Sequence, residues 1–261
     1  MTIAGSDSSA GAGIQADLKT FAAFGVYGTS VITAITAQNT RGIGRVEALS
    51  PEIVAAQIDA VVSDIGADVV KTGMLGSGPV IDVVASKLLQ YNLTQLVLDP
   101  VLAASDGRPL LEEDAVILLR EKLLPLALVV TPNVDEAGAL LGRRLEGRED
   151  VQRAAQEIID IGARNVVITG GDAAGPAIDL FFDGEQYHEF AAARVDTMNT
   201  HGTGCTFAAA IAASLAKGSA PRQAVAMAKA YVTKAMQMSF PLGHGRGPLH
   251  HFFRYWQDTT A

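Results

Sequence analysis

Short segments rich in β-branched residues alternate with amphipathic segments along the whole chain. This alternation is typical of α/β proteins, in which helices join parallel strands and cover both faces of the sheet. No low-complexity linker or shift in composition divides the sequence. We therefore predict a single α/β domain over residues 1–261, with a mostly parallel central sheet between two layers of helices.

The predicted elements end at residues that favour turns or helix termini. Pro51 suits the first turn of a helix, where its missing N–H costs little, and Asp99-Pro100 ends a buried strand. Strands are expected at 1–4, 30–36, 68–72, 95–98, 127–130 and 165–169, with two more flanking the turn Asp183-Gly184. Helices are expected at 14–24, from Pro51 onward, and at 80–89, 113–123, 151–161, 203–217 and 221–238.

Composition excludes several classes of protein. The 261 residues are 49% hydrophobic, which is too apolar for a disordered chain. They contain no apolar run of about 18 residues that would suggest a membrane helix. The net charge of −8 argues against a role in coating nucleic acid or a membrane surface. We expect a cytoplasmic protein, and its one cysteine, Cys205, forms no internal disulfide.

A glycine-rich loop follows the first predicted strand. Its Gly11-x-Gly13-x-x-Ala16 segment matches a dinucleotide-binding fingerprint in the correct context between strand and helix. That fingerprint also needs an acidic residue after the second strand, and the chain has no carboxylate there before Glu47. A tight turn would explain the glycines alone. A small-molecule site would also explain Asp7 and the neighbouring hydroxyl groups, so Asp7 is a candidate substrate-binding residue.

Residues 199–206 precede an apolar, alanine-rich helix and contain two glycines. The backbone N–H groups of Gly202 to Cys205 should point out of the helix N-terminus, where such groups bind anions. The same dipole is expected to lower the pKa of the Cys205 thiol. The alternative is a capped helix with a small buried cysteine.

The segment Thr200-His201-Gly202-Thr203-Gly204-Cys205-Thr206 strongly resembles the anion-hole motif of the hydroxymethylpyrimidine and phosphomethylpyrimidine kinases of thiamine biosynthesis, which are ribokinase-like proteins. Other blocks agree in order, so that the resemblance covers essentially the whole chain and implies a three-layer α/β/α ribokinase-like fold. These blocks are residues 4–7, 11–20, 37–40, 71–75, 99–101, 131–133 with Glu136, and 247–252.

The resemblance implies a kinase that uses ATP and Mg²⁺ to phosphorylate 4-amino-5-hydroxymethyl-2-methylpyrimidine and then its monophosphate. It also implies a homodimer. The chain has neither a Walker A loop nor a protein-kinase catalytic loop. One alternative is a pyridoxine, pyridoxal or pyridoxamine kinase, alone or as a second activity. A non-catalytic vitamin-binding module and a dinucleotide-dependent oxidoreductase are rivals from other classes.

The resemblance assigns catalytic roles to the anion loop. Cys205 takes the place of a catalytic aspartate and becomes the candidate base for the substrate hydroxymethyl group. The N–H groups of Gly202, Thr203 and Gly204 are expected to stabilise the transferring phosphoryl group.

The same resemblance implies that Asn133 and Glu136 position the magnesium ion and the phosphates. Asp99 is a further candidate near the metal. Asn133 and Glu136 lie three residues apart at the start of a helix, so both can face one site. The alternatives are a helix cap for Asn133, a partner of the helix dipole for Glu136, and a turn residue before proline for Asp99.

The remaining candidates concern the acceptor and the nucleotide. The Gln38 amide offers one donor and one acceptor, which match an aminopyrimidine edge but also tolerate a vitamin B6 ring. At the nucleotide site, relatives often have lysine in place of Thr169, and Lys71 or Arg194 could compensate for its charge. By resemblance, Gly5, Ala12, Gln38, Met74 and Val101 surround the pyrimidine, and Thr169, Gly171 and Asn133 bind the nucleotide.

Overall fold

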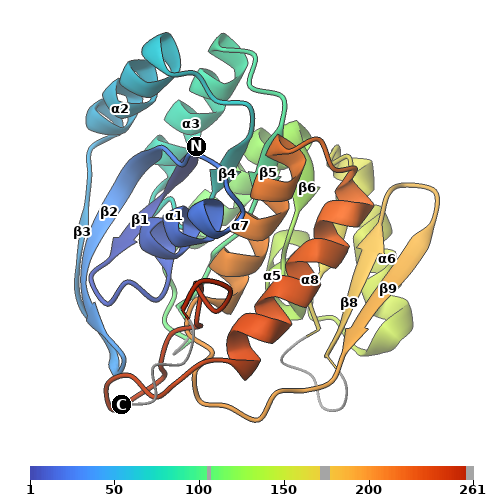
Figure 1. Cartoon of the computed structure of the whole chain (residues 1–261). Coiled ribbons are helices and arrows are strands. Elements are labelled where there is room, and N and C mark those ends of the chain that lie inside the picture. The colour runs from blue at the N-terminus through green and yellow to red at the C-terminus, as the bar shows by residue number, and fades with distance from the viewer. Residues whose placement is uncertain (105–106, 171–176, 257–261) are drawn as a thin grey trace.

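The computed structural model describes residues 1–104, 107–170 and 177–256. Within them, nine strands form one sheet in the order β3-β2-β1-β4-β5-β6-β7-β8-β9 (Figure 1). The six central strands, β2, β1, β4, β5, β6 and β7, are parallel to one another. The outer strands β3, β8 and β9 pair antiparallel with their neighbours. The strands are β1 (Thr2–Asp7), β2 (Ser30–Asn39), β3 (Gly42–Ala48), β4 (Val70–Thr72), β5 (Leu96–Leu98), β6 (Ala127–Val130), β7 (Val166–Ile168), β8 (Ala177–Phe182) and β9 (Tyr187–Ala192).

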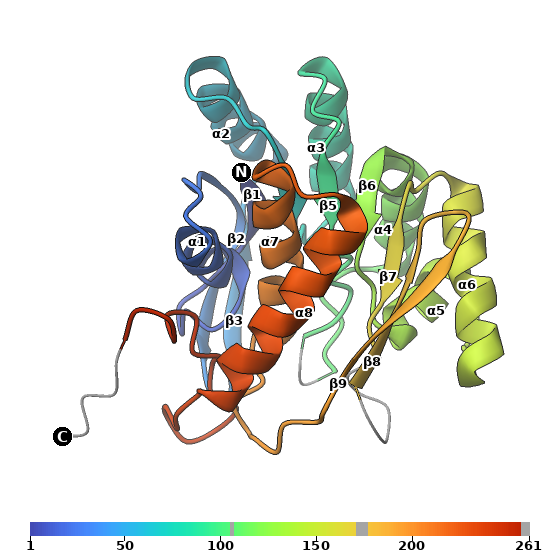
Figure 2. The same cartoon turned by 45° about the vertical axis from the view of Figure 1, so that its right-hand side comes forward.

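Helices cover both faces of the sheet, which confirms the three-layer α/β/α arrangement (Figure 2). One face carries α2 (Pro51–Asp64), α3 (Gly78–Gln90), α4 (Glu113–Leu118), α5 (Val134–Leu141) and α6 (Gly147–Ile161). The other carries α1 (Gly13–Ala23), α7 (Thr203–Ala216) and α8 (Pro221–Gln237).

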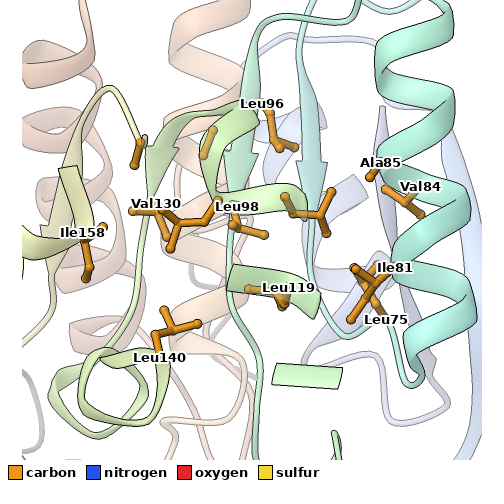
Figure 3. Close-up of a cluster of buried hydrophobic side chains, with 14 of the residues drawn as sticks. Leu75, Ile81, Val84, Ala85, Leu96, Leu98, Leu119, Val130, Leu140 and Ile158 are labelled. Carbon is orange, nitrogen blue, oxygen red and sulfur yellow. The ribbon is translucent and has the colours of Figure 1, made fainter. Parts of the chain in front are cut away.

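Alternation along the central strands supplies apolar side chains to both layers. On β5, Leu96 and Leu98 pack into the core beneath α3 and α5 (Figure 3). Val97, between them, packs into the core on the opposite face of the sheet. Helix α7 buries every residue from Thr206 to Ser214, five of them alanine. Because alanine is small, α7 can lie close against both the sheet and α8. The start of α7 is thereby fixed relative to the strand ends.

The structure differs from the predicted elements in three places. Strand β3 was not predicted, because it is an edge strand whose residues are mostly exposed and show no apolar alternation. The predicted helix 113–123 divides into α4 and a π-helical turn, Leu119–Leu123, followed by a short 3₁₀ turn. Strands β1 and β2 run further than expected, so that Asp7 and Gln38 lie on strand ends.

The carboxyl ends of the parallel strands meet at one edge of the sheet, which is where open α/β sheets bind ligands. Candidate residues lie at or directly after the ends of β1, β2, β5, β6 and β7. No helix in the described parts of the chain is both long and apolar enough to span a membrane.

Candidate active site

The N-terminus of α7 meets the glycine-rich first loop at a very close backbone approach. Gly202 caps α7 with φ +84°, a left-handed conformation that favours glycine. A Cβ at Gly202 would overlap the carbonyl oxygen of Gly11, and one at Gly11 would overlap the His201 ring. Both glycines are therefore required for the two loops to touch.

Asp7 is the hydrogen-bonding centre of this junction. One carboxylate oxygen accepts from the backbone N–H and hydroxyl of Ser9 at 2.8 and 2.7 Å. The other accepts from the N–H groups of Gly11 and Ala12 at 3.2 and 2.8 Å and lies 2.8 Å from His201 Nε2. Burial alone would raise the pKa of Asp7, but the bonds from His201, Ser9 and Ala12 lower it to about 2. The carboxylate is thus ionised and turned into its own loop, where it organises the backbone.

Gln38 completes the junction from the end of β2. Its side-chain amide nitrogen lies 3.2 Å from His201 Nε2, and its amide oxygen lies 3.2 Å from Thr36 Oγ1. Its backbone N–H donates to Ser8 Oγ, whose hydroxyl donates back to the Gln38 carbonyl. Gln38 and the start of α7 are therefore neighbours, although 163 positions separate Gln38 from His201.

A buried ion cluster lies beneath Cys205. Lys71 Nζ, on β4, lies 3.1 Å from Asp17 Oδ2 and 3.4 Å from Asp99 Oδ2, and no part of the Lys71 side chain is exposed. Although burial alone would lower the pKa of Lys71, the nearby carboxylates raise it well above its usual range. Burial raises the pKa of both Asp17 and Asp99. Lys71 is therefore held in this buried cluster. It does not extend to the nucleotide site, where it could have replaced the positive charge that relatives carry in place of Thr169.

Cys205, in the first turn of α7, contradicts the expected thiol pKa. Burial raises that pKa to about 12, because the desolvation of the thiolate outweighs the attraction of Lys71 and the hydrogen bond from the Gly13 N–H. Asp99 and Asp17 raise it further through their negative charge. The local sequence showed only the helix N-terminus, which favours a lower thiol pKa. It did not show the burial of Cys205 or its proximity to Lys71, Asp99 and Asp17.

Asn133 and Glu136 form a capping box at the start of α5. The Glu136 N–H donates to Asn133 Oδ1 at 2.8 Å, and the Asn133 N–H donates to Glu136 Oε2 at 2.9 Å. Asn133 also pairs with Thr169 in an isolated β-bridge, which places the ends of β6 and β7 side by side. Asn133 is thus a helix cap, and Glu136 lies in the first turn of α5, where its charge faces the helix dipole. Both residues also lie at the edge of the sheet where the ligand site is predicted.

The other predicted acceptor residues lie around the same strand ends. Gly5 packs so closely on Met74 that a Cβ would overlap the Met74 methyl group. Ala12 caps α1, and the Val101 N–H donates to the Asp99 carbonyl directly after β5. Gly171 lies outside the described residues.

The buried ion pair of Asp17 with Lys71 was missed from the sequence. The available signal was a charged residue on the buried face of a helix, flanked by Ala16 and Leu18, together with a lysine inside the short strand β4. A matched pair of buried charges is rarely found unless the two groups meet. Their pairing could have been suspected from burial, but not their position behind Cys205.

Comparison with known proteins gives a consistent family. The family described as phosphomethylpyrimidine kinase matches residues 7–250. The chain is 53% identical over 262 residues to the hydroxymethylpyrimidine/phosphomethylpyrimidine kinase of Rhizobium meliloti, covering 99% of this chain and 98% of that protein. It is 50% identical to the thiamine biosynthesis bifunctional protein of Geobacter sulfurreducens, covering 96% of this chain but only 51% of that longer relative.

Solved structures agree in fold and in sequence. The ADP complex of Bacillus subtilis pyridoxal kinase matches with a TM-score of 0.88 and 41% identity, covering 96% of this chain and 95% of that one. The phosphomethylpyrimidine kinase of Clostridium difficile matches with a TM-score of 0.81 and 42% identity, covering 90% and 97%.

Proposed function

The chain belongs to the phosphomethylpyrimidine kinase family, and from this premise we propose its reaction and its residues. It transfers the γ-phosphoryl group of ATP to the hydroxyl of 4-amino-5-hydroxymethyl-2-methylpyrimidine, and then a second phosphoryl group to the monophosphate. The observation that carries the proposal is the contact between the Gln38 region and the start of α7, through Asp7 and His201. This contact brings an amide suited to an aminopyrimidine next to a helix terminus suited to a phosphoryl group.

The acceptor ring binds against Gln38, between the first loop and the residues that follow β4 and β5. Gly5, Ala12, Met74 and Val101 form the walls, and the absence of a Cβ at Gly5 makes room for Met74. Asp7 acts indirectly: its carboxylate is occupied by the backbone of the first loop and by His201, so it holds the shape of the loop.

The transferring phosphoryl group lies at the N-terminus of α7. The N–H groups of Gly202, Thr203 and Gly204 stabilise its developing charge. Cys205 receives the proton of the attacking hydroxyl, a general-base contribution worth about 10²–10⁴-fold. This role requires the thiolate. Lys71 favours it, but burial outweighs Lys71 and keeps the thiol protonated at neutral pH in the protein without bound substrates, so the proton must leave Cys205 once the substrates are bound.

Mg²⁺ fits the oxygen donors at the start of α5. Mg²⁺ usually keeps several waters and binds one or two carboxylates plus substrate phosphates, so a single carboxylate at this place is enough to hold it. Glu136 would hold the ion, partly through water, and Asp99 adds negative charge nearby. The bound ion would neutralise charge on the phosphates.

ATP binds with its phosphates near Asn133, Thr169 and Gly171. The bridge between Asn133 and Thr169 supports this placement, because it joins two strand ends close to the proposed metal. We also propose a cytoplasmic homodimer with no nucleic-acid or membrane partner. Light scattering of the purified protein would test the dimer.

A second activity toward vitamin B6 is favoured by one observation. The pyridoxal kinases of Bacillus subtilis and Staphylococcus aureus match this chain with TM-scores of 0.88 and 0.89 and with 41% and 38% identity. The neutral amide of Gln38 is compatible with either ring.

The test is incubation with ATP, Mg²⁺ and each acceptor, followed by mass analysis of the products. We expect a pyrimidine monophosphate and then a pyrophosphate; the absence of both would refute the proposed function. Competition between the two acceptors at equal concentration then ranks pyridoxal against the pyrimidine.

A further inference from the structure

We propose that the Asp7–His201 pair fixes the orientation of the Gln38 side-chain amide, and that this orientation selects an aminopyrimidine edge over a vitamin B6 ring. The proposal rests on the acceptor site described above. It makes His201 a specificity-determining residue that acts through Gln38.

The first step concerns the proton on His201. Its Nε2 lies 2.8 Å from Asp7 Oδ2, and an ionised carboxylate only accepts hydrogen bonds. Nε2 must therefore carry a proton, whether the ring is neutral or charged. The His201 ring has little freedom to turn away, because it lies directly against Gly11. The backbone of His201 is also held, since its N–H donates to the Gly247 carbonyl.

The second step concerns the two ends of the Gln38 amide. With the amide nitrogen 3.2 Å from Nε2, two donors would face each other. A half-turn of the amide brings its NH₂ group to Thr36 Oγ1 and its oxygen to the Nε2–H group, whose single hydrogen it then shares with Asp7 Oδ2 in a three-centre bond. Thr36 can accept that bond, because its own hydroxyl proton is donated to the Ser6 carbonyl at 3.0 Å. This orientation pairs a donor with an acceptor at both ends of the amide.

The third step concerns the substrate. The Gln38 backbone is held at both its N–H and its carbonyl by Ser8, so the amide is the part left to adjust. Held by His201 and Thr36, it offers its remaining lone pair beside His201 and its remaining N–H beside Thr36. An aminopyrimidine carries an amino donor next to a ring-nitrogen acceptor and can match that order. A vitamin B6 ring lacks this pair and gains nothing from a fixed amide.

Two substitutions test the specificity. His201→Leu removes the N–H donor, and Thr36→Val removes the acceptor at the other end of the amide with little change in shape. Acceptor binding is measured by calorimetry without ATP, using the hydroxymethylpyrimidine and pyridoxal as probes. Each variant should weaken pyrimidine binding at least about tenfold, the loss expected for one well-oriented hydrogen bond, and change pyridoxal binding less than about threefold. His201→Gln, which restores a donor toward Asp7, should recover most of the loss. An equal effect on both rings in both variants would overturn the proposal.

The proton on His201 is tested without any substrate. In protein labelled with ¹⁵N-histidine, we expect the His201 signal, identified by its loss in His201→Gln among the five histidines, to show a protonated Nε2. Asp7→Asn, whose amide can donate to that nitrogen, should move the proton to Nδ1. A wild-type signal with an unprotonated Nε2 would overturn the proposal, even if the kinase activity is confirmed. Conversely, a protein without kinase activity would refute the proposed function. The ¹⁵N measurement would then still decide whether His201 can orient the Gln38 amide.

Discussion

The ammonium group of Lys71 lies 3.1 Å from a carboxylate oxygen of Asp17, and neither side chain is exposed to solvent. Asp99 is the second carboxylate of this cluster. Thr2 donates a further hydrogen bond to Asp17. The cluster thus joins β1, α1, β4 and the end of β5 behind the proposed catalytic thiol.

Replacing Lys71 with methionine should be strongly destabilising. Removing one partner of a buried ion pair leaves uncompensated charge and typically costs about 3–5 kcal/mol. Urea unfolding of Lys71→Met should show a loss of this size. The control is Lys87→Met, whose partner Asp59 is 41% exposed, and which should cost less than about 1 kcal/mol. Similar losses in the two variants would contradict the buried cluster.

Cys205 should react slowly with alkylating agents at neutral pH. Because burial raises its pKa to about 12, and only the thiolate reacts, the iodoacetamide rate should keep rising through pH 10. A plateau near pH 7 would show that the helix dipole dominates after all. As the chain has one cysteine, the modification reports this site alone. Cys205→Ala should retain the fold by circular dichroism and lower kcat at least about tenfold.

Two glycines of the anion loop should respond oppositely to alanine. Gly202→Ala places a Cβ against the Gly11 carbonyl at φ +84°. A left-handed residue alone costs about 1–2 kcal/mol, so we expect a total loss above about 2 kcal/mol and little activity. A Cβ at Gly204 meets nothing within 4 Å, so Gly204→Ala should fold at least as stably as wild type. Thermal unfolding of both variants decides this; equal destabilisation would argue against the close loop contact.

Local patterns in the sequence were sufficient to predict the three layers, the parallel core and the start of α7 at Thr203. They could not predict β3, because an exposed edge strand lacks the apolar alternation that marks buried strands. The contact of Asp7 with His201 joins residues 194 positions apart and depends on how α1 and α7 pack.

The pKa of the Cys205 thiol also could not be predicted from local sequence. Its position at a helix N-terminus was visible in residues 200–206 and favours a low pKa. The opposing influences come from burial and from Asp99 and Asp17, which reach it only in the folded chain. Candidate site residues could therefore be named from motifs, whereas their protonation depends on tertiary structure.

Glu136→Gln separates the two roles of that residue. Glutamine can still accept the hydrogen bond from the Asn133 N–H, so the capping box should be preserved. If Glu136 holds Mg²⁺, the Mg²⁺ concentration for half-maximal rate should rise about 10–100-fold. Asp135→Asn removes an equal charge from the same helical turn at an exposed position and should leave the Mg²⁺ requirement nearly unchanged. Equal shifts in both variants would indicate a general charge effect only.

His251 should make folding stability depend on pH below neutrality. It is buried, with Nε2 3.0 Å from Thr206 Oγ1, and burial lowers its pKa from 6.5 to about 3. A lowered pKa means that the unfolded chain binds the proton first, so the stabilisation is complete above pH 6.5 and is lost as pH falls toward 3. One such group contributes about 1.4 kcal/mol per pH unit within that window. Urea unfolding from pH 7 to pH 4 should therefore show a slope that His251→Gln reduces by about this amount, while His244→Gln, at an exposed position, retains it. An unchanged slope in His251→Gln would show that this histidine accepts its proton while the protein is folded.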